Sequence, residues 1–198
     1  MFDEKDLILE AKHVTRRFPA PGGRKLTACN DVSLHFYRGR TLGLTGESGC
    51  GKSTFLRLLV RLDAPTEGEI LFHGMDLTKL RGEELRQTRQ QIQMVFQDPG
   101  GSFNPRMKIR DIICEPLLNF GRIRPSEKDA AARKYLEAVD LPADFADRFP
   151  HSLSGGEQQR AAIARAIALE PEIIVMDEAT SALDVSVQAQ ILNLLLKQ

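Results

Sequence analysis

The eight residues GESGCGKS at positions 46–53 decide the fold of this chain. They fit the pattern G-x-x-x-x-G-K-[ST], in which glycines let successive backbone amides turn towards a phosphate group. Lys52 is expected to reach the β- and γ-phosphates of a nucleotide, and the Ser53 hydroxyl to bind Mg²⁺. A short apolar run over 41–46 comes before this loop and helical spacing over 52–62 follows it, which predicts a strand, a phosphate-binding loop and a helix. The residues expected to line the phosphate site are Gly46, Glu47, Ser48, Gly49, Cys50, Gly51, Lys52, Ser53 and Thr54.

A second motif ends an apolar run near the end of the chain. Residues 173–176 are apolar, and Asp177 and Glu178 follow them directly. A buried strand that ends in acid presents a carboxylate at the sheet edge where nucleotides bind. We expect Asp177 to hold Mg²⁺, directly or through water, and Glu178 to act as the general base for the attacking water. Many apolar strands end in an acidic residue, so this motif alone does not indicate a nucleotide site. It does so when a phosphate-binding loop precedes it in the same chain.

The third motif is LSGGEQQR at 153–160, called the signature segment below. The Ser154 hydroxyl and the amides of Gly155 and Gly156 would open a helix and offer donors to an anion. The octapeptide resembles the signature of ABC ATPases, and the resemblance covers the whole chain. It implies an α/β P-loop NTPase of the ABC cassette type, with ATP and Mg²⁺ as cofactors. It also implies that the signature segment meets the γ-phosphate held by a second cassette, through Ser154, Gly155, Gly156 and Glu157.

Smaller elements of the same family follow in the family's order. Gln97 resembles the glutamine that contacts Mg²⁺ and senses the γ-phosphate, so it joins Lys52 and Glu178 as a candidate catalytic residue. Residues 181–184 resemble the loop that crosses the interface between two cassettes. Phe18 stands where the family places an aromatic residue on adenine, and the alternative is a ring that packs on the sheet.

Within the family, residues 95–99, 102–106 and 181–190 resemble the oligopeptide, dipeptide and nickel importer cassettes. The resemblance implies an ATP-hydrolysing subunit that energises a membrane importer from the cytoplasmic face of the cell membrane. Its partners would be a second cassette, identical or different, and integral membrane permease subunits that dock near 97–106. The transported solute is not encoded here, because cassettes of this type do not contact it.

Composition argues against some other classes. The 27 basic residues balance the 27 acidic ones, so no basic excess points to nucleic acid. No apolar run reaches the roughly 18–20 residues that span a bilayer. The cysteines lack C-x-x-C spacing, which favours a reduced, cytoplasmic protein with Cys29, Cys50 and Cys114 as ordinary small residues. Two rivals stay open: a soluble ABC ATPase acting on DNA or ribosomes, and a nucleotide-binding module that does not hydrolyse ATP.

Periodicity predicts a mixed organisation. Alternation indicates an antiparallel β portion near the N-terminus, including a strand over 31–36, and buried strands are expected over 92–96 and 172–177. Helical spacing marks 109–120, 127–139 and 155–169, and the second of these is expected to be capped by Ser126 with Asp129. The expected domains are a P-loop ATPase core, 1–96 with 153–198, and a helical insert, 97–152.

The end of the chain suggests a C-terminally shortened cassette. The sequence stops at Gln198 inside an apolar helical pattern that starts near 185, without a stop signal. The switch histidine of the family would lie further on, and His13, His35, His73 and His151 all precede the signature segment. We therefore expect this chain to bind ATP but to hydrolyse it poorly.

Overall fold

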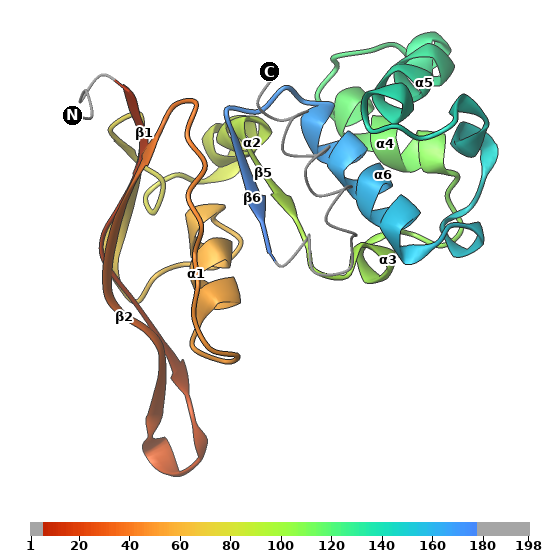
Figure 1. Ribbon diagram of the computed structural model, residues 1–198. Coiled ribbons are helices and arrows are strands. Elements are labelled where there is room, and N and C mark those ends of the chain that lie inside the picture. Colours follow the sequence, from red (N-terminus) through yellow and green to blue (C-terminus); the bar gives the residue numbers. More distant parts are fainter. Residues whose placement is uncertain (1–5, 178–198) are drawn as a thin grey trace. The chain divides into compact units, whose positions relative to one another are not determined.

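A computed structural model describes residues 6–177 of the chain (Figure 1). Two compact units divide it, Met1–Arg89 and Gln90–Gln198. Sheets and helices occur in both, which confirms the predicted α/β class.

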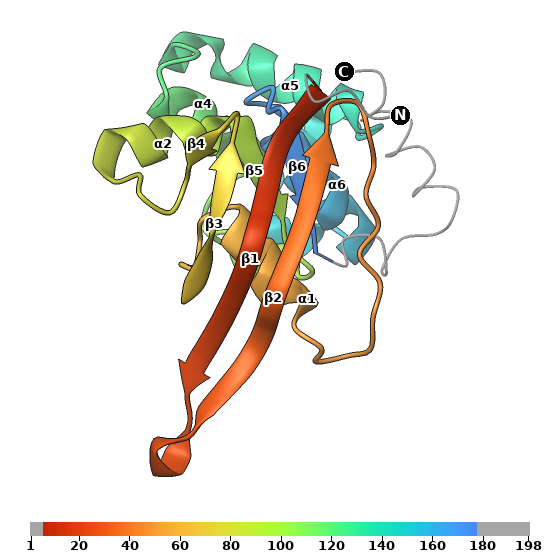
Figure 2. The same cartoon turned by 90° about the vertical axis from the view of Figure 1, so that its left-hand side faces the viewer.

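An antiparallel sheet forms the first unit, in the strand order β2-β1-β3-β4. Its strands are β1 (Leu7–Pro19), β2 (Lys25–Tyr37), β3 (Glu67–Phe72) and β4 (Met75–Asp76). A single 3-10 turn, Pro21–Gly23, joins β1 to β2, and this end of the hairpin extends past α1 (Figure 2). In β2, Val32, Leu34 and Phe36 are half-buried and the residues between them are exposed, so the predicted antiparallel β portion is confirmed.

Helix α1 (Lys52–Leu59) lies against one face of this sheet (Figure 2). It buries Phe55, Leu58 and Leu59, and the sheet contributes fully buried residues such as Leu9 and Ile70. Burial of each large apolar side chain stabilises the unit by about 1.5–3 kcal/mol. This apolar packing fixes the position of α1 on the sheet.

The predicted strand over 41–46 is wrong in this structure. Residues 40–47 carry no regular secondary structure, and the side chains of Leu42 and Leu44 are 51% and 40% exposed. An apolar run becomes a strand only when a neighbouring strand pairs with its backbone. The sheet of this unit consists of β2, β1, β3 and β4, and none of these strands pairs with residues 41–46. The apolar run therefore does not form a strand in this unit.

The second unit begins within the polar helix α2 (Gly82–Gln91) and contains a two-stranded parallel sheet. Strand β5 (Ile92–Val95) pairs with β6 (Ile173–Met176) in register from Ile92 opposite Ile173 to Val95 opposite Met176. The helices are α3 (Pro99–Ser102), α4 (Ile109–Asn119), α5 (Lys128–Ala138) and α6 (Gly155–Ile167). Three 3-10 turns connect them: Pro125–Glu127, Ala143–Asp147 and Pro150–Ser152.

Helices α4, α5 and α6 share one apolar core (Figure 1). Ile113, Leu136 and Ile163, one from each helix, are at most 1% exposed. The Tyr135 hydroxyl donates a hydrogen bond of 3.1 Å to the carbonyl of Ala168, so the end of α6 is tied to α5. The core thus fixes α6, the helix that follows the signature serine.

The predicted cap of the second helix is also wrong. A 3-10 turn starts at Pro125, which places Ser126 inside the turn, and α5 starts only at Lys128. The Glu127 carboxylate accepts a hydrogen bond of 2.7 Å from the Arg124 amide. Asp129 instead pairs with Arg110, at 3.2 Å. The early turn at proline therefore moves the capping position ahead of the serine.

Candidate functional site

The phosphate loop, residues 46–53, leads into α1 through a tight contact with β2. Gly51 is the N-cap of α1 and has a φ of 100°, which favours glycine. A Cβ atom at Gly51 would lie 2.0 Å from the carbonyl oxygen of Ala28. Only glycine allows this approach of the two backbones, so the strand holds the end of the loop at the start of the helix.

Lys52 folds back over its own loop. Its ammonium group donates hydrogen bonds to the carbonyls of Gly46, at 2.7 Å, and Glu47, at 2.8 Å. It also lies 3.8 Å from the Cys50 sulfur. The loop therefore closes around the positive charge of Lys52.

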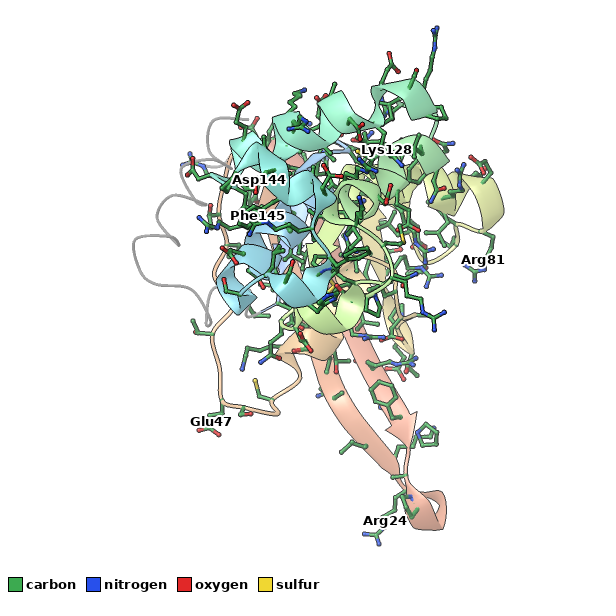
Figure 3. The ribbon with its side chains drawn as sticks, turned by 90° about the vertical axis from the view of Figure 1, so that its right-hand side faces the viewer. Arg24, Glu47, Arg81, Lys128, Asp144 and Phe145 are labelled. Atoms are coloured by element: carbon green, nitrogen blue, oxygen red, sulfur yellow. The ribbon has the colours of Figure 1, made fainter. Side chains whose placement is uncertain are left out.

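The remaining predicted residues of this loop reach solvent. Residues 46–50 and Ser53 are exposed, Thr54 is half-buried, and the Glu47 side chain points outward (Figure 3). Phe18 lies in β1 near the hairpin turn, opposite Leu26, with the Arg16 guanidinium 4.5 Å from the centre of its ring. Phe18 is half-buried and already stacked by a cation, so its predicted contact with adenine stays a prediction.

Cys29 contacts the phosphate loop, and sequence reasoning missed this. The buried Cys29 thiol donates a long hydrogen bond, 3.6 Å, to the carbonyl of Gly51. Burial, with a smaller contribution from Cys50, raises the pKa of the Cys29 thiol. Because strand β2 and the loop are far apart in sequence, only the three-dimensional fold reveals the contact.

In the second unit, two of the predicted residues follow neighbouring strands. Gln97 comes two residues after β5 and Asp177 directly after β6, and these strands are parallel. The amide of Asp177 donates a hydrogen bond of 3.0 Å to the carbonyl of Val95, which extends the pairing to the strand end. Asp177 is 8% exposed and Gln97 is exposed. One sheet edge therefore carries both predicted magnesium ligands of this unit.

The signature segment forms the start of α6. Ser154 is the N-cap, its hydroxyl accepts from the Glu157 amide at 3.4 Å, and Gly155 and Gly156 are the first helical residues. The Gln158 side chain donates to the carbonyls of Pro150, at 2.9 Å, and Leu153, at 3.1 Å. Gln158 thus links the first turn of α6 to the 3-10 turn that precedes it. The signature motif alone does not indicate this role.

Some predicted residues lie outside the described range: the general base Glu178, the loop at 181–184 and the helix at 185–197. Over residues 6–177, no cluster of three or more His, Cys, Asp or Glu side chains is arranged to hold a metal ion. In that same range, no helix has the length and apolar character needed to cross a membrane.

A phosphate loop at the start of a helix and an acidic residue at the end of a parallel strand define the class of P-loop nucleotide-binding proteins. A family model described as "ABC transporter" matches residues 29–181, well over half of the chain. The chain therefore belongs to the ABC transporter family.

Named relatives give a finer comparison. The oligopeptide transport ATP-binding protein AppF of Bacillus subtilis (strain 168) is 48% identical over 96% of this chain and 60% of its own length. The dipeptide transport ATP-binding protein DppF of Escherichia coli (strain K12) is 43% identical over 96% of this chain and 58% of its own length. The chain thus spans about three fifths of the length of these curated relatives.

A solved structure shares the fold. It is described as a dimeric structure of a post-hydrolysis state of the ATP-binding cassette MJ0796 bound to ADP and Pi. Its TM-score is 0.87 at 34% identity, and the match covers 95% of this chain and 81% of that chain. The predicted cassette fold is confirmed by this match.

Proposed function

We propose that this chain binds ATP with Mg²⁺ and hydrolyses it to drive a membrane importer. The observation that carries the proposal is the joint presence of the phosphate loop and a capped signature helix in one chain. Each motif offers hydrogen-bond donors to an anion, and two cassettes with opposed motifs would enclose two ATP molecules, one at each phosphate loop.

The first step is nucleotide binding at the phosphate loop. Gly51 holds the end of the loop against the Ala28 carbonyl, where a Cβ atom would clash, and Lys52 supplies the positive charge. Ser53, Gln97 and Asp177 are the proposed magnesium ligands, and their hydroxyl, amide and carboxylate oxygens suit this hard cation. Bound Mg²⁺ would neutralise charge on the phosphates. Phe18 is the proposed contact of the adenine ring.

The second step is hydrolysis. Glu178 is the proposed general base that takes a proton from the attacking water, and Gln97 the residue that senses the γ-phosphate. Lys52 offsets the charge that develops on the transferred phosphoryl group. Ser154, Gly155, Gly156 and Glu157 belong to the proposed half-site that a second cassette presents.

The biological setting follows from the relatives. Those reported above are named for oligopeptide and dipeptide transport, so a peptide is the cargo class we propose. The nickel importers that the motifs also resemble stay a prediction from sequence. We propose a second cassette and integral membrane permease subunits as partners, no nucleic acid, and a peripheral position on the cytoplasmic face of the cell membrane. Under this proposal the core is 1–96 with 153–198, and the insert is 97–152.

Two experiments separate this function from its rivals. Turnover of MgATP that is lost in Glu178→Gln supports an ATPase, and no turnover of MgATP by the folded wild-type protein would support a non-hydrolysing module. Affinity purification of the tagged protein from detergent-solubilised native membranes should recover permease subunits. Recovery of ribosomal or DNA-associated proteins without a permease would support the soluble rival.

A further inference from the structure

The donors at the start of the signature helix already have a partner in this chain. The Glu157 carboxylate accepts hydrogen bonds from the Ser154 amide, at 2.7 Å, and from the Ser154 hydroxyl, at 2.9 Å. Both groups belong to Ser154, whose hydroxyl is one of the donors expected above for the phosphate of an opposing nucleotide. In the structure described here they bind the protein's own carboxylate.

This carboxylate carries a negative charge at neutral pH. The hydrogen bonds from Ser154, the backbone amide first, hold the pKa of Glu157 below its usual range. Arg160 and Arg148 act on it in the same direction with smaller effects. The start of α6 attracts anions because the first amides of a helix have no carbonyl partner within the helix, and one anion of the chain itself is already present there.

We propose that Glu157 is a resident anion that competes with the terminal phosphate of the opposing nucleotide for the Ser154 donors. The inference rests on the proposed function, in which two cassettes enclose ATP. When the cassettes close, Ser154 exchanges the carboxylate for the phosphate, and when phosphate leaves, Glu157 restores the resting contact. Glu157 is therefore a positioning residue that weakens closure and favours reopening.

The substitution Glu157→Gln tests the charge and keeps the cap. Glutamine also forms the capping box with serine, so the start of α6 is retained while the negative charge is lost. The matched control is Glu170→Gln, which removes the same charge from an exposed residue just past the other end of α6. Both are made together with Glu178→Gln, so that ATP persists during the measurement.

The readout is the dimerisation constant by sedimentation velocity with MgATP, at equal nucleotide occupancy measured with a fluorescent ATP analogue. Glu157→Gln should dimerise roughly two- to fivefold more tightly than its parent, the effect of one partly exposed charge at a helix start. The gain should shrink at high salt, and Glu170→Gln should match the parent.

The outcomes are distinct. Equal or weaker dimerisation of Glu157→Gln, with dimers formed by the parent, overturns the resident-anion inference and leaves the proposed function in place. Absence of MgATP-dependent dimers from every variant overturns the two-cassette mechanism, and the inference with it. A far-ultraviolet circular dichroism spectrum and a urea melt of Glu157→Gln that match the parent show that the folded state is compared.

Discussion

Lys52 donates a 2.7 Å hydrogen bond to the carbonyl of Gly46, so the lysine of the phosphate loop is bound to the first residue of its own motif. Glu157 is bound in the same way to Ser154 at the start of the signature helix. In each motif, a charged side chain of the chain itself contacts the groups that are proposed to surround ATP. Nucleotide binding would then be an exchange of partners in a loop that is already closed.

This relationship predicts the effect of removing the charge. Lys52→Ala should lower affinity for MgATP by at least about tenfold, because a charge-assisted hydrogen bond to phosphate contributes about 1.5–3 kcal/mol. Arginine in the same place should not restore affinity, since its planar group does not replace the compact ammonium. Titration calorimetry of the wild type and both variants measures this.

Gly51 should not tolerate a side chain. Gly51→Ala places a Cβ 2.0 Å from the Ala28 carbonyl oxygen, and its positive φ adds about 1–2 kcal/mol to the cost. We expect a loss of about 2–5 kcal/mol in the free energy of unfolding, because the steric overlap costs about 1–3 kcal/mol beyond the backbone strain, together with loss of ATP binding. The matched control is Gly74→Ala, whose φ is 76° and whose Cβ would meet nothing within 4 Å. Urea unfolding that shows equal losses for both variants would disprove the close contact.

Thiol labelling should distinguish the three cysteines. Cys50 is exposed, whereas burial raises the pKa of Cys29 and raises that of Cys114 to about 11. Thiolates react and thiols do not, so at pH 8 one thiol should react quickly in the native protein and three in urea. The Cys50→Ser variant should lose the fast phase. A fast phase that persists in this variant would place Cys29 or Cys114 at the surface.

The core of the second unit depends on one buried hydroxyl. Tyr135→Phe removes the hydrogen bond to the Ala168 carbonyl and should lower the free energy of unfolding by about 1–2 kcal/mol. Tyr135 is none of the proposed contacts of ATP or Mg²⁺, and its hydroxyl binds Ala168 at the end of α6, so ATP affinity of the folded variant should stay unchanged. Chemical unfolding and calorimetry on the same samples check both statements, and wild-type stability would show that the bond contributes nothing.

Acid should weaken the ion pairs between α4 and the turn at Ala143–Asp147. Hydrogen bonding to Lys108, with Arg110 nearby, lowers the pKa of Asp147 in the folded state. Stability from a lowered carboxyl pKa is present above the unfolded value and is lost as pH falls through the folded value. The free energy of unfolding of Asp147→Asn should therefore fall less than that of the wild type as the pH drops below about 4. Urea midpoints from pH 7 to pH 3 that fall equally in both proteins would contradict this.

The sequence predicted the features that depend on local patterns. Helices α1 and α4 to α6, the antiparallel β portion near the N-terminus, and the acidic end of β6 all appear near their expected places. Periodicity and capping residues act over a few residues, so one sequence contains that information.

The features that the sequence did not predict depend on distant neighbours. Residues 41–46 have the pattern of a strand, but the first unit's sheet does not pair with them. The contact of Gly51 with Ala28 brings together segments that no motif connects. The Glu157 contact differs, because Ser154 and Glu157 form a capping box whose pattern is local and visible in the sequence.

Titration calorimetry with MgATP on wild type and Lys52→Ala measures whether the phosphate loop of this chain binds ATP. We expect saturable binding of one ATP per chain in the wild type and at least about tenfold weaker binding in the variant. Absence of binding to the folded wild-type chain, or equal affinity in the two proteins, would contradict it.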